Sequence, residues 1–202
     1  MSVMGVQVRT RKAACTVAAS MAMLGAAFVA IAARADDGVE TILAELADGG
    51  EVVYFRHAAT TWSGVDRIEG PRERQRLLSE RGIKDSIRIG AAFRERGLPV
   101  GEVLASPFAR CRDMAELAFD RVEERAELLG LLSDADGREE RVRYLRERMS
   151  IPPAAGANRI LVSHTSNVAE VAGVRLVEGE AVVVRPDGDG FEVLGTVSPH
   201  EW

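Results

Sequence analysis

Two histidines in this 202-residue chain each follow directly on a short hydrophobic run. Val52–Phe55 leads into Arg56 and His57, and Ile160–Val162 is followed one residue later by His164. Short continuous apolar runs with β-branched residues indicate buried strands. Because ligands of open α/β sheets bind where the carboxyl ends of the strands converge, we expect the two histidines to meet at one edge of a sheet.

A third hydrophobic run, Val103–Ala105, leads through Ser106 and Pro107 into a predicted helix that carries Arg110 near its start. The N-terminus of a helix attracts anions through its free N–H groups and its dipole. A guanidinium group placed there adds a bidentate fork that suits phosphate oxygens. The sequence therefore predicts that four side chains from three segments converge: Arg56, His57, Arg110 and His164.

Two arginines and two histidines form a poor metal site, since metals prefer neutral or anionic ligands, and we expect neither a metal nor a cofactor. A neutral imidazole is a competent nucleophile toward phosphorus when an acceptor fixes its other nitrogen. Arg56, Arg110 and His164 could offset the charge on the equatorial phosphoryl oxygens. The pattern favours phosphoryl transfer from a small phosphorylated substrate.

Segments of helical period separate the predicted strands, which favours an α/β sandwich of three layers with a mostly parallel central sheet. Ser79 and Gly97 have the types expected at the start and end of one helix. A strand over Leu128–Leu132 is a weaker prediction. The remaining expected elements are helices over about 39–46, 107–119, 138–149 and 167–172, and a hairpin of residues 181–185 with 191–197.

The first 35 residues have the layout of a secretory signal peptide. Positive charges precede an uncharged stretch from Ala13 to Ala33, and we expect cleavage after Ala35 and export to the periplasm or the medium. The alternative is a retained membrane anchor, because the stretch approaches the roughly 20 residues that cross a bilayer as a helix. Residues 36–202 would then form one domain.

The net charge of −5 disfavours partners such as nucleic acid or anionic lipid, and the sequence does not indicate an oligomeric state. The predicted signal peptide carries only positive charges, so the domain that remains is more acidic still. Cys111 is the one cysteine of that domain, which excludes an intramolecular disulfide. We expect Cys111 to pack inward.

Four motifs at these positions resemble the histidine phosphatase superfamily, which shares its fold with the cofactor-dependent phosphoglycerate mutases. They are RHAAT at residues 56–60, LSERG at 78–82, SPFARCRDMAEL at 106–117 and VSHTSN at 162–167. The similarity extends from about Val52 to Ala172, and EGEAVVVRPDG at residues 178–188 resembles the ending of small exported bacterial members.

The resemblance implies a phosphatase that hydrolyses a phosphomonoester through transient phosphorylation of His57. It implies that Arg56 and Arg110 hold the phosphoryl group and that His164 completes the pocket. By the same matching, Thr60 would lie beside the phosphate.

The sequence departs from the family at the proton donor for the leaving group. Many relatives use a glutamate after the third strand or an aspartate after the second histidine, whereas Thr165 follows His164 here. Asp134 is the predicted donor, with Glu127 as a further candidate. Without a donor, the same pocket would serve a non-catalytic module that binds phosphate or a phosphorylated ligand, or a phosphatase directed at phosphohistidine.

Two other features have plainer interpretations. His200, in the final residues of the chain, is expected to be exposed. Four arginines between the first strand and the Ser79 helix could form a second anion-binding patch near the site. Acidic residues alternate with them, so we favour a solvated loop: Arg67, Arg72, Arg74 and Arg76.

Overall fold

The computed structural model describes residues 38–62, 64, 66–69, 71–133 and 136–202. The predicted signal peptide and the predicted proton donor Asp134 therefore lie outside the described residues. Within the described part of the chain, no helix is long and apolar enough to cross a membrane.

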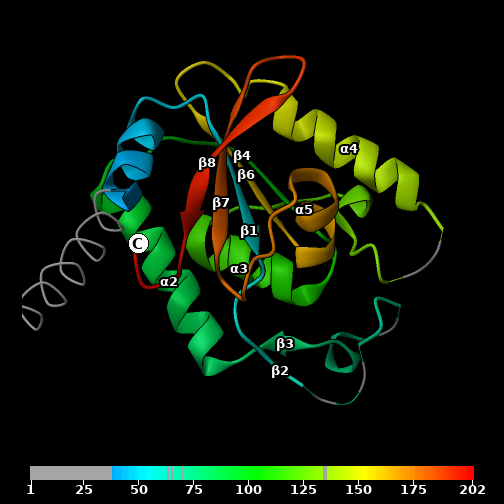
Figure 1. Cartoon of the computed structure of the whole chain (residues 1–202). Helices are drawn as coiled ribbons and strands as arrows, with labels where there is room; N and C mark the ends of the chain where they lie inside the picture. Colours follow the sequence, from blue (N-terminus) through cyan, green and yellow to red (C-terminus); the bar gives the residue numbers. More distant parts are fainter. Residues whose placement is uncertain (1–37, 63, 65, 70, 134–135) are drawn as a thin grey trace, which may run out of the picture. The chain divides into compact units, whose positions relative to one another are not determined.

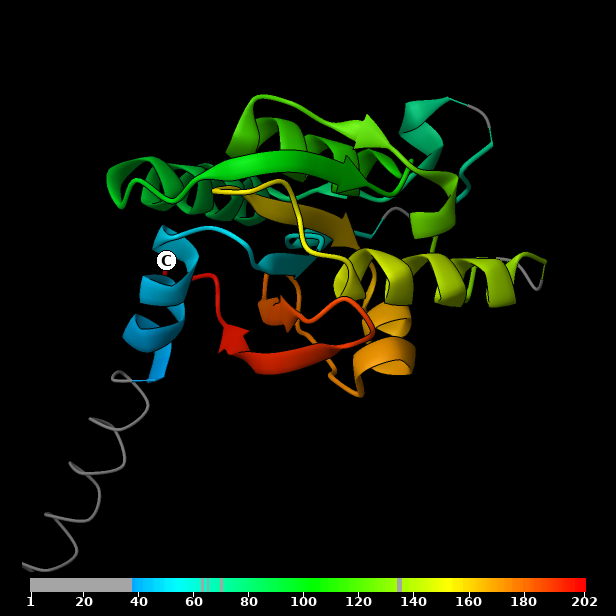
Figure 2. The ribbon, with the colours of Figure 1, turned by 90° about the horizontal axis from the view of Figure 1, so that it is seen from above.

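A six-stranded sheet in the order β5-β4-β6-β1-β7-β8 forms the centre of the domain (Figure 2). Strands β5, β4, β6 and β1 run parallel to one another, and β7 and β8 add an antiparallel edge. Its strands are β1 (Val52–Arg56), β4 (Val100–Ala105), β5 (Glu123–Glu124), β6 (Asn158–Ser163), β7 (Ala181–Pro186) and β8 (Phe191–Val197). The predicted mostly parallel sheet and the C-terminal hairpin are confirmed.

Strand β1 is buried on both faces of the sheet, which explains its unbroken hydrophobic sequence. Val53 and Phe55 belong to one apolar core, whereas Val52 and Tyr54 belong to the other. Successive side chains of a strand point to opposite faces, so helices on both sides require apolar residues at every position.

Helices cover the two faces of the sheet. The helix of residues 38–47, α2 (Glu80–Glu95) and α3 (Ala109–Phe119) pack against the face of Val53 and Phe55. Figure 1 shows α4 (Arg138–Ser150) and α5 (Thr165–Ala172) together to the right of the sheet, where they pack on the opposite core. The predicted three-layer α/β arrangement is thereby confirmed.

Helix α2 begins where the sequence predicts. The Ser79 hydroxyl accepts a hydrogen bond from the N–H of Gly82 at 3.1 Å, as an N-cap does. The backbone turns into the left-handed region at Gly97, with φ of 66°, just beyond the end of the helix. Both boundary residues therefore have the local roles that their types indicate.

The predicted strand over Leu128–Leu132 is wrong. Residues Ala126–Leu128 form a short 3-10 helix, η2, and turns follow it. The strand that pairs with β4 at the sheet edge is β5, which lies earlier in the sequence. Leu128 and Leu131 still bury their side chains, which accounts for the apolar run without a strand.

Two short elements escaped prediction. Strands β2 (Thr60–Thr61) and β3 (Leu77–Leu78) pair antiparallel as a separate two-stranded sheet below the main one in Figure 1. A single 3-10 turn, η1 (Arg72–Arg74), lies between them in the sequence. This small sheet closes the loop that follows the first motif and returns the chain to α2.

Candidate active site

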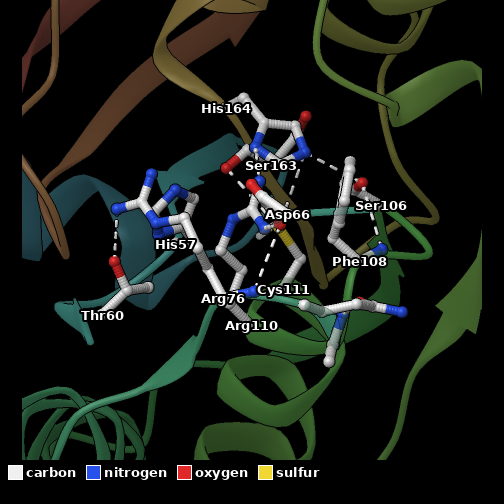
Figure 3. Close-up of polar contacts among 12 residues, drawn as sticks. His57, Thr60, Asp66, Arg76, Ser106, Phe108, Arg110, Cys111, Ser163 and His164 are labelled. Atoms are coloured by element: carbon white, nitrogen blue, oxygen red, sulfur yellow. Dashed lines mark hydrogen bonds and ion pairs between the residues drawn. The ribbon is translucent and has the colours of Figure 1, made fainter. Parts of the chain in front are cut away.

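The carboxyl ends of three adjacent parallel strands surround one cavity of about 480 Å³. Strand β1 ends at Arg56 and His57, β6 ends just before His164, and the chain enters α3 from β4. The cavity is lined by all four side chains that the sequence predicts to converge, Arg56, His57, Arg110 and His164. Figure 3 shows His57, Arg110 and His164 grouped in this way.

His57 is held in one tautomer by its own loop. Its Nδ1 lies 3.0 Å from the carbonyl oxygen of Ala58. Because a carbonyl can only accept, Nδ1 carries the proton and Nε2 keeps the lone pair. Burial, reinforced by the positive charges of Arg110, Arg56 and Arg76, lowers the pKa of His57 to about 3. The imidazole is therefore neutral at physiological pH.

His164 lies beside His57, with the two ring centres 5.6 Å apart, and its orientation is fixed from three sides. The Tyr54 hydroxyl accepts from the His164 N–H at 3.1 Å and donates to its carbonyl at 2.8 Å. Arg110 Nη2 donates to Nδ1 at 3.5 Å, so Nε2 carries the proton and donates to the Ser106 hydroxyl at 3.0 Å. Burial lowers the pKa of His164 well below its usual value.

Arg110 is almost completely buried and is held by a carboxylate and an aromatic ring. Its Nη1 donates to Asp66 Oδ1 at 2.9 Å, and its guanidinium carbon lies 4.2 Å from the centre of the Phe108 ring. Asp66 also accepts from the backbone N–H of Arg76 at 3.2 Å. Asp66 therefore ties the loop after β1 to the start of α3.

Arg56 projects from the end of β1 toward the segment that precedes β7. Its Nη1 donates to the carbonyl of Leu176 at 3.0 Å, and its Nη2 lies 3.7 Å from the carboxylate of Glu178. Burial lowers the pKa of Arg56, and Glu178 partly offsets that effect. Arg56 nevertheless remains charged, because an arginine pKa lies far above neutrality.

A further arginine, Arg76, belongs to this site, so its interpretation as part of a solvated loop is wrong. Its guanidinium lines the cavity and donates to Glu178 at 3.0 Å. Figure 3 shows Arg76 beside His57 and Arg110. The sequence feature that could have predicted this position is Leu77–Leu78, an apolar pair directly after Arg76, which forms β3 and pairs with Thr60–Thr61.

The other three arginines of that loop behave differently from Arg76. Arg67 also lines the cavity but its side chain is exposed, and Arg72 pairs at the surface with Asp113. Arg74 is exposed, as predicted for a solvated loop.

Three arginines, Arg56, Arg76 and Arg110, bring positive charge to the cavity wall, which favours an anionic ligand. Within the described residues, no three His, Cys, Asp or Glu side chains come together as metal ligands.

Thr60 lies behind the arginines rather than along the cavity wall. Its hydroxyl donates to Glu178 at 2.9 Å and accepts from Arg76. The predicted contact between Thr60 and phosphate stays a prediction. Two carboxylates that the sequence did not single out, Asp66 and Glu69, line the cavity.

The plainer expectations for Cys111 and His200 are confirmed. Cys111 is fully buried, with its sulfur 3.8 Å from the Ser163 carbonyl, and burial raises the pKa of its thiol to about 12. His200 is exposed.

The fold and the position of the cavity define a phosphoglycerate mutase-like α/β protein. Residues 52–140 match the histidine phosphatase superfamily (branch 1). The match includes three of the four sequence motifs, at residues 56–60, 78–82 and 106–117, and agrees with the resemblance that they indicate. No curated protein matches the sequence.

Solved structures of phosphatases have the same fold at low sequence identity. The protein histidine phosphatase SixA complexed with tungstate is 16% identical, with a TM-score of 0.56 over 74% of this chain and 97% of that chain. The alpha-ribazole phosphatase from Shigella flexneri is 15% identical, with a TM-score of 0.55 and coverage of 74% and 96%. A phosphoserine phosphatase mutant from Entamoeba histolytica in complex with phosphoserine is 11% identical, with a TM-score of 0.52 and coverage of 75% and 98%.

Proposed function

We propose that this protein is a metal-independent phosphatase that hydrolyses a phosphomonoester through a phosphohistidine at His57. The observation that carries the proposal is the hydrogen bond between His57 Nδ1 and the Ala58 carbonyl. It leaves the Nε2 lone pair on a neutral, buried imidazole in a cavity lined by arginines. Those are the requirements for nucleophilic attack on a phosphorus atom.

The first step forms a bond between His57 Nε2 and phosphorus while the bond from phosphorus to the leaving oxygen breaks. Arg56, Arg76 and Arg110, which line the cavity, would donate to the phosphoryl oxygens. Such donors stabilise the charge that spreads over the equatorial oxygens in the transition state. In the second step water attacks the phosphohistidine and gives a proton to the group that protonated the leaving oxygen. Phosphate is released, and both the Nε2 lone pair and the acid are restored.

The leaving oxygen takes up a proton in the first step, and a carboxylic acid is the expected donor. Asp66 is already engaged by Arg110, whose Nη1 donates to its Oδ1 at 2.9 Å. Asp134 stays the donor that the sequence predicts. Glu69, an exposed carboxylate on the cavity wall, is the structural alternative. Separate Asp134→Asn and Glu69→Gln variants distinguish the two candidates. Loss of the true donor should lower kcat more for substrates with poor leaving groups than for substrates with good ones.

Hydrolysis of p-nitrophenyl phosphate by residues 36–202, in the presence of a chelator, tests the proposal. We expect turnover in the wild type and its loss in His57→Ala, whereas His200→Ala, which changes an exposed histidine, should match the wild type. A folded protein that binds phosphate without turning over this easy substrate would refute the phosphatase and support the phosphate-binding module. Turnover that the chelator abolishes would refute metal independence.

We further propose that residues 1–35 direct export and are removed after Ala35. The basis is the charged start and the apolar stretch of the sequence, together with the acidic domain that follows. Mass spectrometry of the full-length protein expressed in a bacterial host tests this proposal. A periplasmic product that begins at Asp36 is expected, and an uncut product in the membrane fraction would favour the anchor.

A further inference from the structure

The segment of residues 176–180, between α5 and β7, wraps around the corner of the chain that carries the nucleophile. The N–H of Arg56 donates to the carbonyl of Glu180 at 3.0 Å, and the N–H of Gly179 donates to the carbonyl of His57 at 3.0 Å. These two hydrogen bonds fix the backbone of Arg56 and His57 to residues 176–180.

The carboxylate of Glu178 projects from the same segment and joins three groups of the site. One oxygen, Oε1, accepts from the Thr60 hydroxyl at 2.9 Å and from Arg76 Nη2 at 3.0 Å, and lies 3.7 Å from Arg56 Nη2. Thr60 in turn accepts a hydrogen bond from Arg76. Glu178 is only about one quarter exposed, so solvent screens these contacts less than at a free surface.

Two guanidinium groups held this close repel each other unless an anion lies between them. Burial is the main cause that lowers the Arg56 pKa; Glu178 opposes it, and the charge of Arg76 adds to it. Glu178 therefore supplies the counter-charge that lets both arginines face one cavity. It contacts each of them at the terminal nitrogen Nη2.

We propose that Glu178 is a positioning residue that holds Arg56 and Arg76 as a pair on the wall of the cavity where the phosphoryl group would bind. The proposal rests on the phosphatase function proposed above. In it, Glu178 acts through the arginines and does not touch the substrate. The EGE motif at residues 178–180 thereby acquires a role in catalysis.

Turnover of p-nitrophenyl phosphate provides the first test. We expect the kcat of Glu178→Ala to fall about 10- to 100-fold, because displacing a catalytic group by about 1 Å has an effect of this size. Glu178→Gln, which keeps an oxygen acceptor without the charge, should fall between the alanine variant and the wild type. Glu192→Gln, on the exposed edge strand β8, is the matched control and should match the wild type. A kcat of Glu178→Ala within twofold of the wild type would overturn the proposal.

A double-mutant cycle on the affinity for inorganic phosphate provides the second test and does not depend on turnover. The loss of affinity caused by Arg76→Ala should be at least about fivefold smaller in the Glu178→Ala background, because Arg76 is no longer held there. Glu178→Gln serves in the cycle if the alanine variant does not fold. Losses that simply multiply would overturn the positioning role.

The two tests separate this proposal from the phosphatase function. A wild type without His57-dependent turnover would refute the phosphatase, whereas the phosphate cycle would still show whether Glu178 couples to Arg76.

Discussion

Replacing Tyr54 with phenylalanine isolates one hydrogen-bonding group that connects the core to the active site. The hydroxyl accepts from the His164 N–H at 3.1 Å and donates to the His164 carbonyl at 2.8 Å. The carbonyl keeps a second partner, the N–H of Asn167 at 3.2 Å, whereas the N–H loses the acceptor that the structure gives it. The cost is therefore that of one buried, unsatisfied backbone donor.

Such a donor costs about 1–3 kcal/mol of unfolding free energy. For a domain of this size, each kcal/mol lowers Tm by about 2–4 °C, so a loss near ~2 kcal/mol corresponds to about 4–8 °C. We expect kcat to fall as well, because the freed backbone lets His164 move relative to His57. Urea unfolding and p-nitrophenyl phosphate turnover measure the two effects.

Tyr144→Phe is the matched control, because Tyr144 is the other tyrosine of the chain and is only partly buried on α4. We expect it to change stability by no more than about 0.5 kcal/mol, as surface substitutions do. Equal stability of Tyr54→Phe and Tyr144→Phe would contradict the role assigned to the buried hydroxyl.

Three further predictions concern pH and the loop around the site. Below about pH 6.5, His57 and His164 become protonated in the unfolded chain but stay neutral in the folded one. As the pH falls toward the pKa of the folded state, each imidazole therefore lowers the unfolding free energy by up to about 1.4 kcal/mol per pH unit. Urea unfolding at pH 7 and pH 5.5 should show a drop about 1 kcal/mol smaller in His57→Ala, and equal drops would contradict the buried neutral imidazole. Ser79→Ala should lose about 1 kcal/mol of stability in urea unfolding through its N-cap, and an unchanged midpoint would exclude this capping role. Gly82→Ala should lose about 1–3 kcal/mol of unfolding free energy in the same assay, because its Cβ would lie 2.1 Å from the Ala59 carbonyl oxygen. Wild-type stability of this variant would show that the backbone near Ala59 moves without cost.

The four convergent side chains could be predicted because local sequence and a general rule of sheet topology together place them. Arg56 ends one buried strand, and His57 and His164 each directly follow one. Arg110 lies in the first turn of a helix that follows a third strand. Once these strands are parallel neighbours, their carboxyl ends meet at one edge. No long-range detail of the fold is needed for that inference.

Arg76 and Glu178 could not be predicted in the same way. They are 102 residues apart, and their contact depends on the two-residue pairing of β2 with β3 and on the path of the chain before β7. Isolated charges in loops are usually solvated, so sequence pattern alone favours the wrong interpretation of Arg76. The Leu128–Leu132 run was wrongly predicted as a strand because burial of Leu128 and Leu131 needs apolar residues whether or not the backbone is extended.

The most direct test of the account is to trap the covalent intermediate. Wild-type protein would be mixed with p-nitrophenyl phosphate, denatured within milliseconds at alkaline pH, where phosphohistidine persists, and digested for mass spectrometry. The account predicts one phosphoryl group on the peptide that contains His57 and none in His57→Ala. Turnover accompanied by phosphorylation of another residue, or by none under conditions that trap an established phosphohistidine enzyme, would contradict it.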